Sequence, residues 1–364
     1  MKKQTLTLAA ALTAAATSAQ AGIDRSGQDI GVLFEEGNYF KFSFANVSPN
    51  ITAPAVGPFT STSQSAVDFS TFSFGYKHQF NEKLSFALIW DQPYGADIQY
   101  VDGPAAGGFA FIDSSQITGI LRYEMGNGFS VHGGAFSQKI SGRVLTASGL
   151  LEADSEREWG GVAGVAYEKP EIALRVALTY FSGIDHQLTG THALPPGAHP
   201  FFPAGVSTAA AGTVSMPEAF NLDFQTGIAQ NTLLFGSIRH AKYDGISLDT
   251  TSTLGDVAPG AANDVNWVNF VDDVTSYELG IGRKLNDNWS VALMLGYEEG
   301  AETGTTFLAP AGSSKSIGLG ATYTHENIKI SGGVRYTKFS EKVVNGVPFE
   351  GDALSAGVSI GIGF

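Results

Sequence analysis

Charged side chains recur in the middle of segments that otherwise alternate between apolar and small residues. In a β-strand each of them would lie on the face opposite the apolar set. Because an ionised group is costly in an apolar medium, we expect these side chains to face the interior and to pair. The set comprises Arg122, Arg175, Arg239, Glu278 and Arg335, with Arg239 on a less regular segment. It is typical either of a structural salt-bridge network or of a polar path that binds a carboxylate.

The 7 histidines form no recognisable catalytic or metal-binding set. The sequence holds no HExxH, G-x-S-x-G or Walker motif. His132 or His186 beside a serine would resemble the Ser/His pair of a hydrolase, and His192 and His199 in a proline-rich stretch would offer two metal ligands. Because the spacing favours neither arrangement, we expect no enzyme activity, no metal and no cofactor.

The overall composition is typical of an exported protein that does not bind nucleic acid. The formal net charge is −14, whereas nucleic-acid binding requires basic patches. The absence of cysteine removes disulfides and thiolate metal sites. Residues 1–21 combine Lys2 and Lys3, a run of small apolar residues and an Ala19-Gln20-Ala21 cleavage pattern. We therefore expect a signal peptide and a mature chain that begins at residue 22.

A strict alternation of residue types marks the elements that must hold the charged set. The C-terminal segment ALSAGVSIGIGF places Leu354, Val358 and Ile362 on one face and small residues on the other. Its length matches the roughly 9–11 residues with which a tilted strand crosses a bilayer. An aromatic residue such as Phe364 on this strand is typical of the closing strand of a bacterial outer-membrane barrel. For this segment alone, a half-buried edge strand of a soluble protein is the alternative.

The same alternation recurs about 14 times from residue 39 onward, and short connections alternate with long ones. Turn-like strings such as Gly126-Asn127-Gly128 and Asn286-Asp287-Asn288 are the short ones. The long ones are residues 50–69, 101–113, 146–157, 191–213, 249–273, 300–313 and 344–352. We therefore predict a single transmembrane antiparallel β-barrel over residues 39–364, in the outer membrane of a Gram-negative bacterium, with both termini in the periplasm. Residues 22–38 are predicted to form a very short N-terminal plug or periplasmic segment.

Several short strings, in this order, resemble the FadL/TodX family of outer-membrane transporters. They are LSFALIWDQPYGADIQY at residues 84–100, the W-G…AG..YE…ALTY.S…G pattern at 159–190, MPEAF at 216–220 and NDNWSVALMLGY at 286–297. The similarity extends from about residue 38 to the C-terminus. One departure is clear: family members carry a longer N-terminal plug with an Asn-Pro-Ala element, which is missing here. This departure leaves room for a more open pore.

The resemblance implies passive transport of long-chain fatty acids or other hydrophobic compounds. An apolar substrate would be captured by external loops and would leave sideways through the wall beside a bent third strand. Pro93, Tyr94 and Gly95 match that bend, because Pro93 cannot donate to a ladder and glycine tolerates unusual backbone angles. The alternative is a simple Pro-Gly bend where this strand enters its external loop.

Apolar residues in two of the long connections are the candidates for substrate capture. They are Leu194, Phe201, Phe202 and Val206 in residues 191–213, and Trp267 and Phe270 in residues 249–273. Packing of the two loops on each other is the alternative reading. The expected partners are the lipid bilayer and a hydrophobic small molecule, detergent or lipid, with no nucleic acid, and we expect a monomer. The competing functions are a general diffusion porin with a charged lumen and an adhesin or structural barrel.

Overall fold

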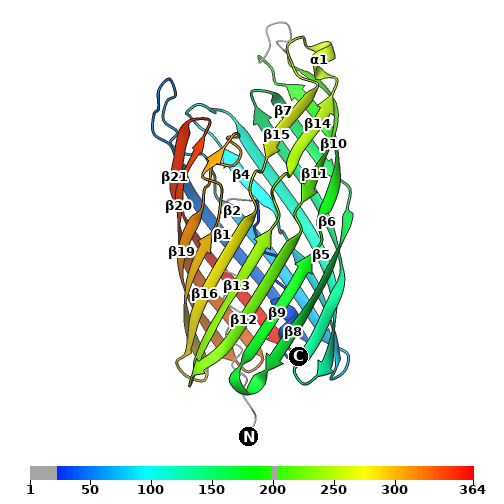
Figure 1. Cartoon of the computed structure of the whole chain (residues 1–364), viewed down its shortest axis with the longest axis vertical. Helices are drawn as coiled ribbons and strands as arrows, with labels where there is room; N and C mark the ends of the chain where they lie inside the picture. The colour runs from blue at the N-terminus through cyan, green and yellow to red at the C-terminus, as the bar shows by residue number, and fades with distance from the viewer. Residues whose placement is uncertain (1–22, 198–203) are drawn as a thin grey trace.

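The computed structural model describes residues 23–197 and 204–364, and a closed antiparallel β-barrel of 14 strands dominates it (Figure 1). The ring closes where its first and last strands pair, from Tyr39 opposite Gly363 to Thr52 opposite Glu350. The predicted strand number and closure are confirmed. In chain order the ring strands are β1 (Tyr39–Thr52), β2 (Phe69–Gln79), β3 (Leu84–Asp91), β5 (Phe109–Gly126), β6 (Phe129–Thr146), β8 (Glu158–Lys169), β9 (Leu174–Phe181), β12 (Ala219–Ala229), β13 (Thr232–Ala241), β16 (Val274–Lys284), β17 (Trp289–Glu298), β19 (Ser314–His325), β20 (Ile328–Val344) and β21 (Val347–Gly363).

The outer surface of the ring is an apolar belt with aromatic borders. On β17, Leu293 and Leu295 are exposed while Met294 between them is buried. Trp289 and Tyr297 lie near the two ends of the same strand, roughly 27 Å apart along it. For a strand tilted by about 40° this corresponds to roughly 21 Å along the barrel axis, close to the height of the apolar band in membrane barrels. This surface fits hydrocarbon better than water.

Short turns join the ring strands at the end of the barrel where the C-terminus lies (Figure 1). Asn127, Asn231 and Glu326 adopt positive φ angles of 54°, 58° and 53° in three of these turns. Asparagine tolerates this region because its side chain is short and polar. The turns therefore reverse the chain within a few residues and keep adjacent strands paired.

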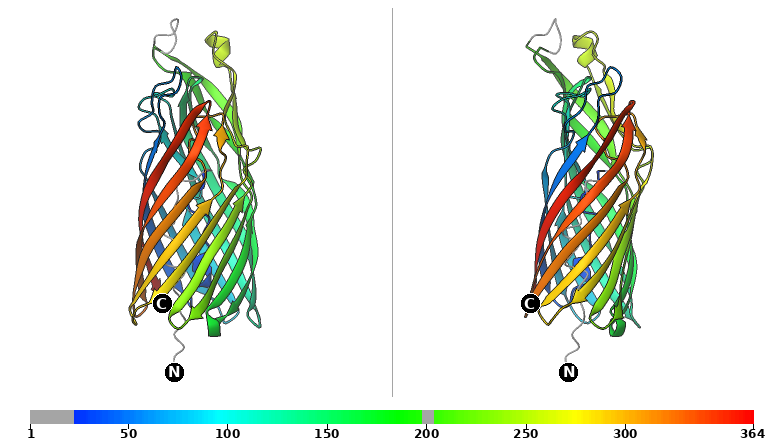
Figure 2. Two further views of the ribbon diagram at one scale, coloured as in Figure 1. Left: turned by 60° about the vertical axis from the view of Figure 1, so that its left-hand side comes forward. Right: turned by 90° about the vertical axis from the view of Figure 1, so that its left-hand side faces the viewer.

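Seven further strands lie outside the ring, toward the opposite end (Figures 1 and 2). They are β4 (Gly95–Gln99), β7 (Gly149–Ser155), β10 (Ile184–Leu194), β11 (Val206–Met216), β14 (Ser247–Ser252), β15 (Asp264–Asn269) and β18 (Thr303–Gly304). β7, β10, β11, β14 and β15 pair in that order and continue the wall formed by β6. We call these five strands the outer sheet.

The outer sheet corrects the prediction that residues 146–157, 191–213 and 249–273 are loops. β10 and β11 pair from Ile184 opposite Met216 to Leu194 opposite Val206. Similarly, residues 344–352 hold only a tight turn at Asn345 rather than a long connection. Beyond the apolar belt one strand face meets water, so the strong hydrophobic alternation that marks the ring strands fades there.

Two segments, residues 172–190 and 214–229, are divided between the ring and the outer sheet. Residues 172–190 form the end of η3 (Pro170–Ile172), then β9 and β10, and residues 214–229 form parts of β11 and β12. Pro217, which has no N–H to donate to a ladder, stands at the second break. At these breaks the chain leaves the ring and returns to it.

The N-terminal segment folds into the barrel. Its short helix η2 (Gly31–Phe34) buries Val32, Leu33 and Phe34, which belong to one apolar cluster with Ile89 and Phe136 of the wall. Another helix among the described residues is α1 (Leu254–Val257), in the outer part of the molecule. Within residues 23–197 and 204–364, no helix has the length and apolar character needed to cross a membrane.

Candidate functional site

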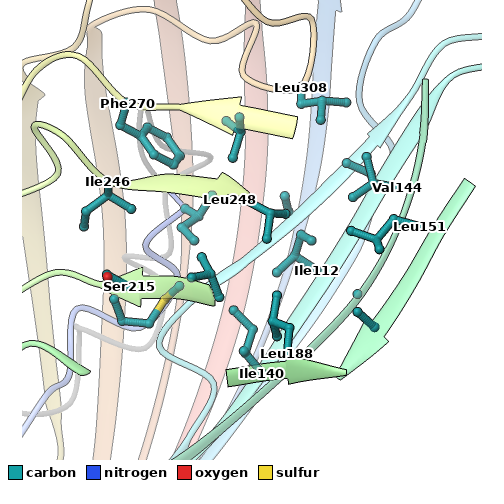
Figure 3. A pocket seen from close by; sticks show the side chains of 18 of the residues that line it. Ile112, Ile140, Val144, Leu151, Leu188, Ser215, Ile246, Leu248, Phe270 and Leu308 are labelled. Carbon is teal, nitrogen blue, oxygen red and sulfur yellow. The ribbon is translucent and has the colours of Figure 1, made fainter. Parts of the chain in front are cut away.

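An apolar cavity, which we call the chamber, lies where the outer sheet extends the barrel wall (Figure 3). Ile112 and Ile140 reach it from the ring, and Leu151, Leu188 and Leu248 reach it from the outer sheet. The rest of its lining is Ile23, Ala96, Ala110, Ser141, Gly142, Val144, Ala153, Val214, Ser215, Met216, Tyr243, Ile246, Val268, Phe270 and Leu308. These residues carry no ionisable group other than one tyrosine.

Strand alternation in the outer sheet points these side chains inward. On β10, Leu188 is buried while Thr189 is exposed, and on β14, Leu248 is buried while Asp249 is exposed. One face of the sheet is therefore dry and the other is wet, as is common for antiparallel sheets that cover a core. The chamber is the space behind the dry face.

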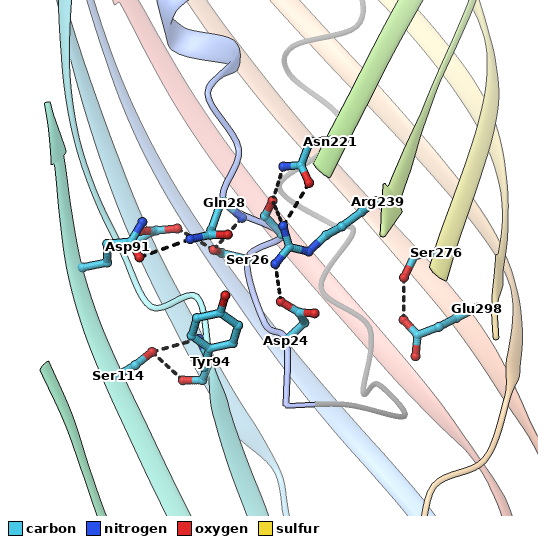
Figure 4. Close-up of polar contacts among 12 residues, drawn as sticks. Asp24, Ser26, Gln28, Asp91, Tyr94, Ser114, Asn221, Arg239, Ser276 and Glu298 are labelled. Atoms are coloured by element: carbon cyan, nitrogen blue, oxygen red, sulfur yellow. Dashed lines mark hydrogen bonds and ion pairs between the residues drawn. The ribbon is translucent and has the colours of Figure 1, made fainter. Parts of the chain in front are cut away.

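The N-terminal segment passes through the lumen near the chamber and is held there by a buried ion pair (Figure 4). Arg239 Nη2 donates to Asp24 Oδ1 at 2.7 Å, and the two side chains are 9% and 4% exposed. Arg239 Nη1 donates to Asn221 Oδ1 at 2.9 Å, and Asn221 Nδ2 donates to the carbonyl oxygen of Gly27 at 2.8 Å. Ring strands β12 and β13 thus hold the segment at two points.

The N-terminal segment also pairs with the bend between β3 and β4, in addition to its contacts with β12 and β13. The Arg25 N–H donates to the Pro93 carbonyl oxygen at 2.7 Å, and the Gly95 N–H donates to the Ile23 carbonyl oxygen at 2.7 Å. These bonds replace the ladder partners that a straight neighbouring strand would supply. In a membrane barrel this matters because an unpaired backbone group away from water costs several kcal/mol.

The centre of the bend is tied to β5 and packed against an arginine. The Ser114 hydroxyl accepts from the Tyr94 N–H at 2.8 Å and donates to the Tyr94 carbonyl oxygen at 2.6 Å (Figure 4). A Cβ atom on Gly95 would lie 2.3 Å from the Arg25 guanidinium carbon, and that guanidinium pairs with Asp97. Glycine therefore lets the bend and the N-terminal segment approach closely.

The bend interrupts the barrel wall. β2 and β3 stop pairing at Phe74 opposite Trp90. The backbone bond from the Val67 N–H to the Asp97 carbonyl oxygen, at 3.0 Å, rejoins the two sides further along. Between these points the edge of β2 has no β3 or β4 ladder partner.

A cavity, which we call the wall cavity, lies at this interruption. Gln92 Oε1 accepts from the Phe72 N–H at 3.1 Å, so one free backbone donor of β2 is satisfied by a side chain. The lining includes polar residues and outward aromatic rings: Ser26, Asp29, Val32, Lys41, Ser43, Phe44, Ala45, Thr71, Phe72, Ser73, Phe74, Gly75, Ile89, Asp91 and Gln92. Because Phe72 and Phe74 are 43% and 38% exposed, the wall cavity reaches the outer face of the barrel.

A barrel with this inserted segment and this interrupted wall is similar to solved outer-membrane channels. A Pseudomonas aeruginosa FadL homologue has a TM-score of 0.70 and 16% identity, with 91% of each chain covered. The Pseudomonas putida toluene transporter TodX has a TM-score of 0.64 and 11% identity, covering 94% of this chain and 97% of that one. This chain has the FadL/TodX fold. No protein-family model matches its sequence, and no curated protein is significantly similar to it.

A third structure of the FadL/TodX fold extends the likeness. The Ralstonia pickettii toluene transporter TbuX has a TM-score of 0.60 and 13% identity, covering 91% of this chain and 90% of that one. At these identities the likeness is one of fold. The chemistry of the site must therefore be argued from the residues of this chain.

Next to the chamber, the FadL/TodX fold of this chain holds a wider cavity of about 720 Å³, the vestibule. Leu194 and Trp267, two of the residues assigned to capture, line it together with Tyr100 and Phe307. Trp267 is 4% exposed and its Nε1 donates to Thr250 Oγ1 at 2.8 Å. β15 turns this ring inward, so Trp267 is buried rather than presented to water.

The other residues assigned to capture do not gather in the vestibule. Phe270 lines the chamber, where its ring centroid lies 5.1 Å from that of Tyr243. Val206 is the first residue of β11 and is partly buried. Phe201 and Phe202 lie outside the residues that the structure describes.

The four arginines among the lumen charges predicted from the sequence contact acids or the N-terminal segment. The fifth residue of the set, Glu278, is the acid that pairs with Arg335. Three of the arginines form ion pairs: Arg122 with Glu168, Arg335 with Glu278 and Arg239 with Asp24. The guanidiniums of Arg122 and Arg175 each lie 4.8 Å from the centroid of the Phe34 ring. These contacts support a structural salt-bridge network rather than a polar path that binds a carboxylate, because the arginines already have partners.

His132, His186 and His192 form buried hydrogen bonds. His186 Nδ1 lies 3.1 Å from Ser155 Oγ and its Nε2 lies 2.9 Å from Gln138 Oε1, an order that resembles a hydrolase triad. The three side chains are 0–2% exposed, and Ser155 Oγ also accepts from the Ile140 N–H at 3.1 Å. A hydroxyl enclosed in this way is not presented to a substrate. His199 lies outside the described residues, and no group of three or more His, Asp or Glu among those described could hold a metal.

The same histidine begins a chain of buried amides that reaches the N-terminal segment. Gln138 Nε2 donates to Gln116 Oε1 at 2.7 Å, and Gln28 Nε2 donates to the same oxygen at 3.2 Å. Because Gln138 Oε1 then accepts from His186 Nε2, the Nε2–H tautomer gives each hydrogen bond of this chain one donor and one acceptor. Sequence analysis did not single out Gln28 or Gln116, since an isolated glutamine carries no spacing signal.

Proposed function

We propose that this protein is a passive outer-membrane transporter of hydrophobic compounds, such as long-chain fatty acids or aromatic hydrocarbons. The main observation that supports the proposal is a series of three cavities: the vestibule, the chamber and the wall cavity. Leu308 lines both the vestibule and the chamber, so these two spaces adjoin. Ser26 lines the wall cavity, two residues along the chain from the Asp24 that Arg239 holds. The likeness to the toluene transporters TodX and TbuX supports the same reading.

The proposed route begins with capture in the vestibule and continues into the chamber. An apolar solute gains about 25 cal/mol for each Å² of apolar surface that leaves water, so the chamber offers it a favourable site. Movement of the Ile23–Arg25 stretch away from the bend would open the way to the wall cavity. The solute then leaves sideways beside Pro93–Gly95 and enters the lipid, where an apolar molecule is stable.

The proposed orientation places the vestibule outside the cell and the short turns in the periplasm. Short turns on one side and longer outer elements on the other are the arrangement of outer-membrane barrels. In this orientation the wall cavity lies in the outer half of the barrel, because the bend follows Leu84–Asp91 on a strand that runs outward. A solute that leaves there bypasses the lower lumen.

Occupation of the lumen argues against the competing porin function. Val32, Leu33 and Phe34 pack inside the barrel, and Arg122 and Lys329 are held in ion pairs with Glu168 and Glu35. A general diffusion pore needs a continuous aqueous path, which this apolar plug obstructs.

Two measurements on one protein test the proposed function. The first is uptake of radiolabelled hydrophobic compounds by a transport-null Gram-negative strain that expresses the protein. The second is ion conductance of the purified protein in planar bilayers. We expect protein-dependent uptake with low conductance. High conductance without hydrophobic uptake would contradict the proposed function and would favour a general diffusion porin.

A further inference from the structure

The vestibule and the chamber share a property that the hydrophobic-transport proposal does not require: their described linings contain no Asp, Glu, Lys, Arg or His. The polar groups of the chamber are the hydroxyls of Ser141, Ser215 and Tyr243 with backbone atoms. The vestibule adds only neutral groups such as Tyr100 and Asn266. Among the residues that the structure describes, a solute that follows this route meets no charged side chain in the lining of either space.

Two arginines on the side of the chamber where the N-terminal segment lies are already paired with acids. Arg239 is paired with Asp24, and Arg25 is paired with Asp97 and lies 3.5 Å from Asp113. These guanidiniums hold the N-terminal segment, so a ligand carboxylate would have to displace a buried partner to reach them.

A buried lysine in the outer barrel lies behind the vestibule rather than in its lining. Lys342 Nζ donates to the Ala311 carbonyl oxygen at 3.3 Å, and Gly304 and Gly312 pack against its side chain. It is not among the residues that line the vestibule or the chamber.

The wall cavity likewise offers no free cation. Lys41, its one basic residue, pairs with Asp29 at 3.1 Å. Asp91, which also lines it, accepts from the Ser26 hydroxyl. Two carboxylates against one ammonium favour a neutral solute over an anionic one at this point.

We propose that the transported molecule is uncharged: a hydrocarbon, or a neutral hydrophobic alcohol, ketone or ester. This inference rests on the proposed transport function and narrows its substrate class. Burial of an unpaired carboxylate in the chamber is strongly unfavourable, so a fatty acid passes only in its protonated form. At pH 7 an acid with a pKa near 4.3 is neutral in about one molecule in 500.

Matched pairs of neutral and anionic compounds test the proposal in the transport-null strain. The pairs are 1-dodecanol with dodecanoate and toluene with benzoate, each measured as uptake above an empty-vector control. At pH 7.5 we expect at least about tenfold faster protein-dependent uptake of the neutral member. From pH 7.5 to 5.5, dodecanoate uptake should rise by about tenfold per pH unit while dodecanol uptake stays constant.

The outcomes separate this inference from the proposed function. If dodecanoate and dodecanol enter equally fast at pH 7.5, the neutral-substrate inference is wrong and hydrophobic transport stands. If neither compound enters faster than in the empty-vector strain, the transport function itself is wrong.

A charge introduced into the chamber gives a second, independent readout. Leu188→Arg places a guanidinium in the lining, whereas Thr189→Arg places one on the exposed face of the same strand. We expect Leu188→Arg to raise the dodecanoate-to-dodecanol uptake ratio at least about tenfold and Thr189→Arg to leave it unchanged. An unchanged ratio in a folded Leu188→Arg protein contradicts the proposal, and if that variant does not fold, the wild-type pairs decide.

Discussion

The Gly95 N–H donates to the carbonyl oxygen of Ile23 at 2.7 Å, joining two residues far apart in the chain. The neighbouring bond from Arg25 to Pro93, also 2.7 Å, makes a short two-bonded contact between the N-terminal segment and the bend. The bend that interrupts the wall and the segment beside it are therefore one structural unit. Movement of one must break hydrogen bonds with the other.

A bulky side chain in the wall cavity should stop hydrophobic uptake. Ser73 lines this cavity on β2, so Ser73→Trp fills the space through which the solute is proposed to leave. We expect uptake of toluene or dodecanol to fall at least about tenfold. The matched control is Ser237→Trp on β13, which adds the same bulk to a polar cavity that meets the wall cavity only at Ser26 and Asp29. Equal uptake by both variants, with heat-modifiable migration intact, would show that exit does not occur beside the bend.

Loss of the Asp24 carboxylate should loosen the N-terminal segment. Asp24→Ala leaves the Arg239 guanidinium buried without its counter-ion, a change that typically costs about 3–5 kcal/mol. Release of the segment lowers this cost by letting water reach the arginine. We expect a severalfold rise in single-channel conductance in planar bilayers. Asp29→Ala is the control, because its ion pair with Lys41 is more exposed, and conductance equal to the control would contradict the prediction.

Leu308 should control passage between the vestibule and the chamber. It lines both spaces, whereas Thr305 in the same loop lines only the vestibule. Leu308→Trp is expected to slow uptake about tenfold by narrowing the connection, and Leu308→Ala should leave uptake equal or faster. Thr305→Trp tests whether added bulk in the loop is sufficient by itself. If it slows uptake as much as Leu308→Trp, Leu308 has no special position.

Removal of the Gln116 amide, which accepts from both Gln28 and Gln138, should make the N-terminal segment more mobile. Gln116→Leu leaves the amide groups of Gln28 and Gln138 without their acceptor, at about 1–3 kcal/mol for each buried donor. The chain has no cysteine, so a Ser26→Cys probe can be labelled with maleimide against no background. We expect faster labelling in the Gln116→Leu background. The control is Gln225→Leu, which removes an amide that donates to the Ala173 carbonyl oxygen. In this background the Ser26→Cys probe should be labelled as fast as in the chain without a second substitution.

Local sequence patterns were enough to predict the ring. Two-residue alternation and turn residues such as Asn127 act over a few neighbouring positions, so they can be recognised one segment at a time. They predicted the strand number and the closure by the last strand. They failed at the outer sheet, where strands such as β10 and β11 have one face in water and no strong apolar alternation.

The residues that meet inside the ring could be identified only from the folded chain. Arg239 lies on a segment without a regular alternation, and its partner Asp24 lies far away in the chain and carries no local signal. The chamber likewise assembles single side chains, such as Ile140 and Leu188, from strands that pair through the outer sheet. Contacts of this kind depend on how distant strands register around the barrel, and the sequence near each residue does not encode that register.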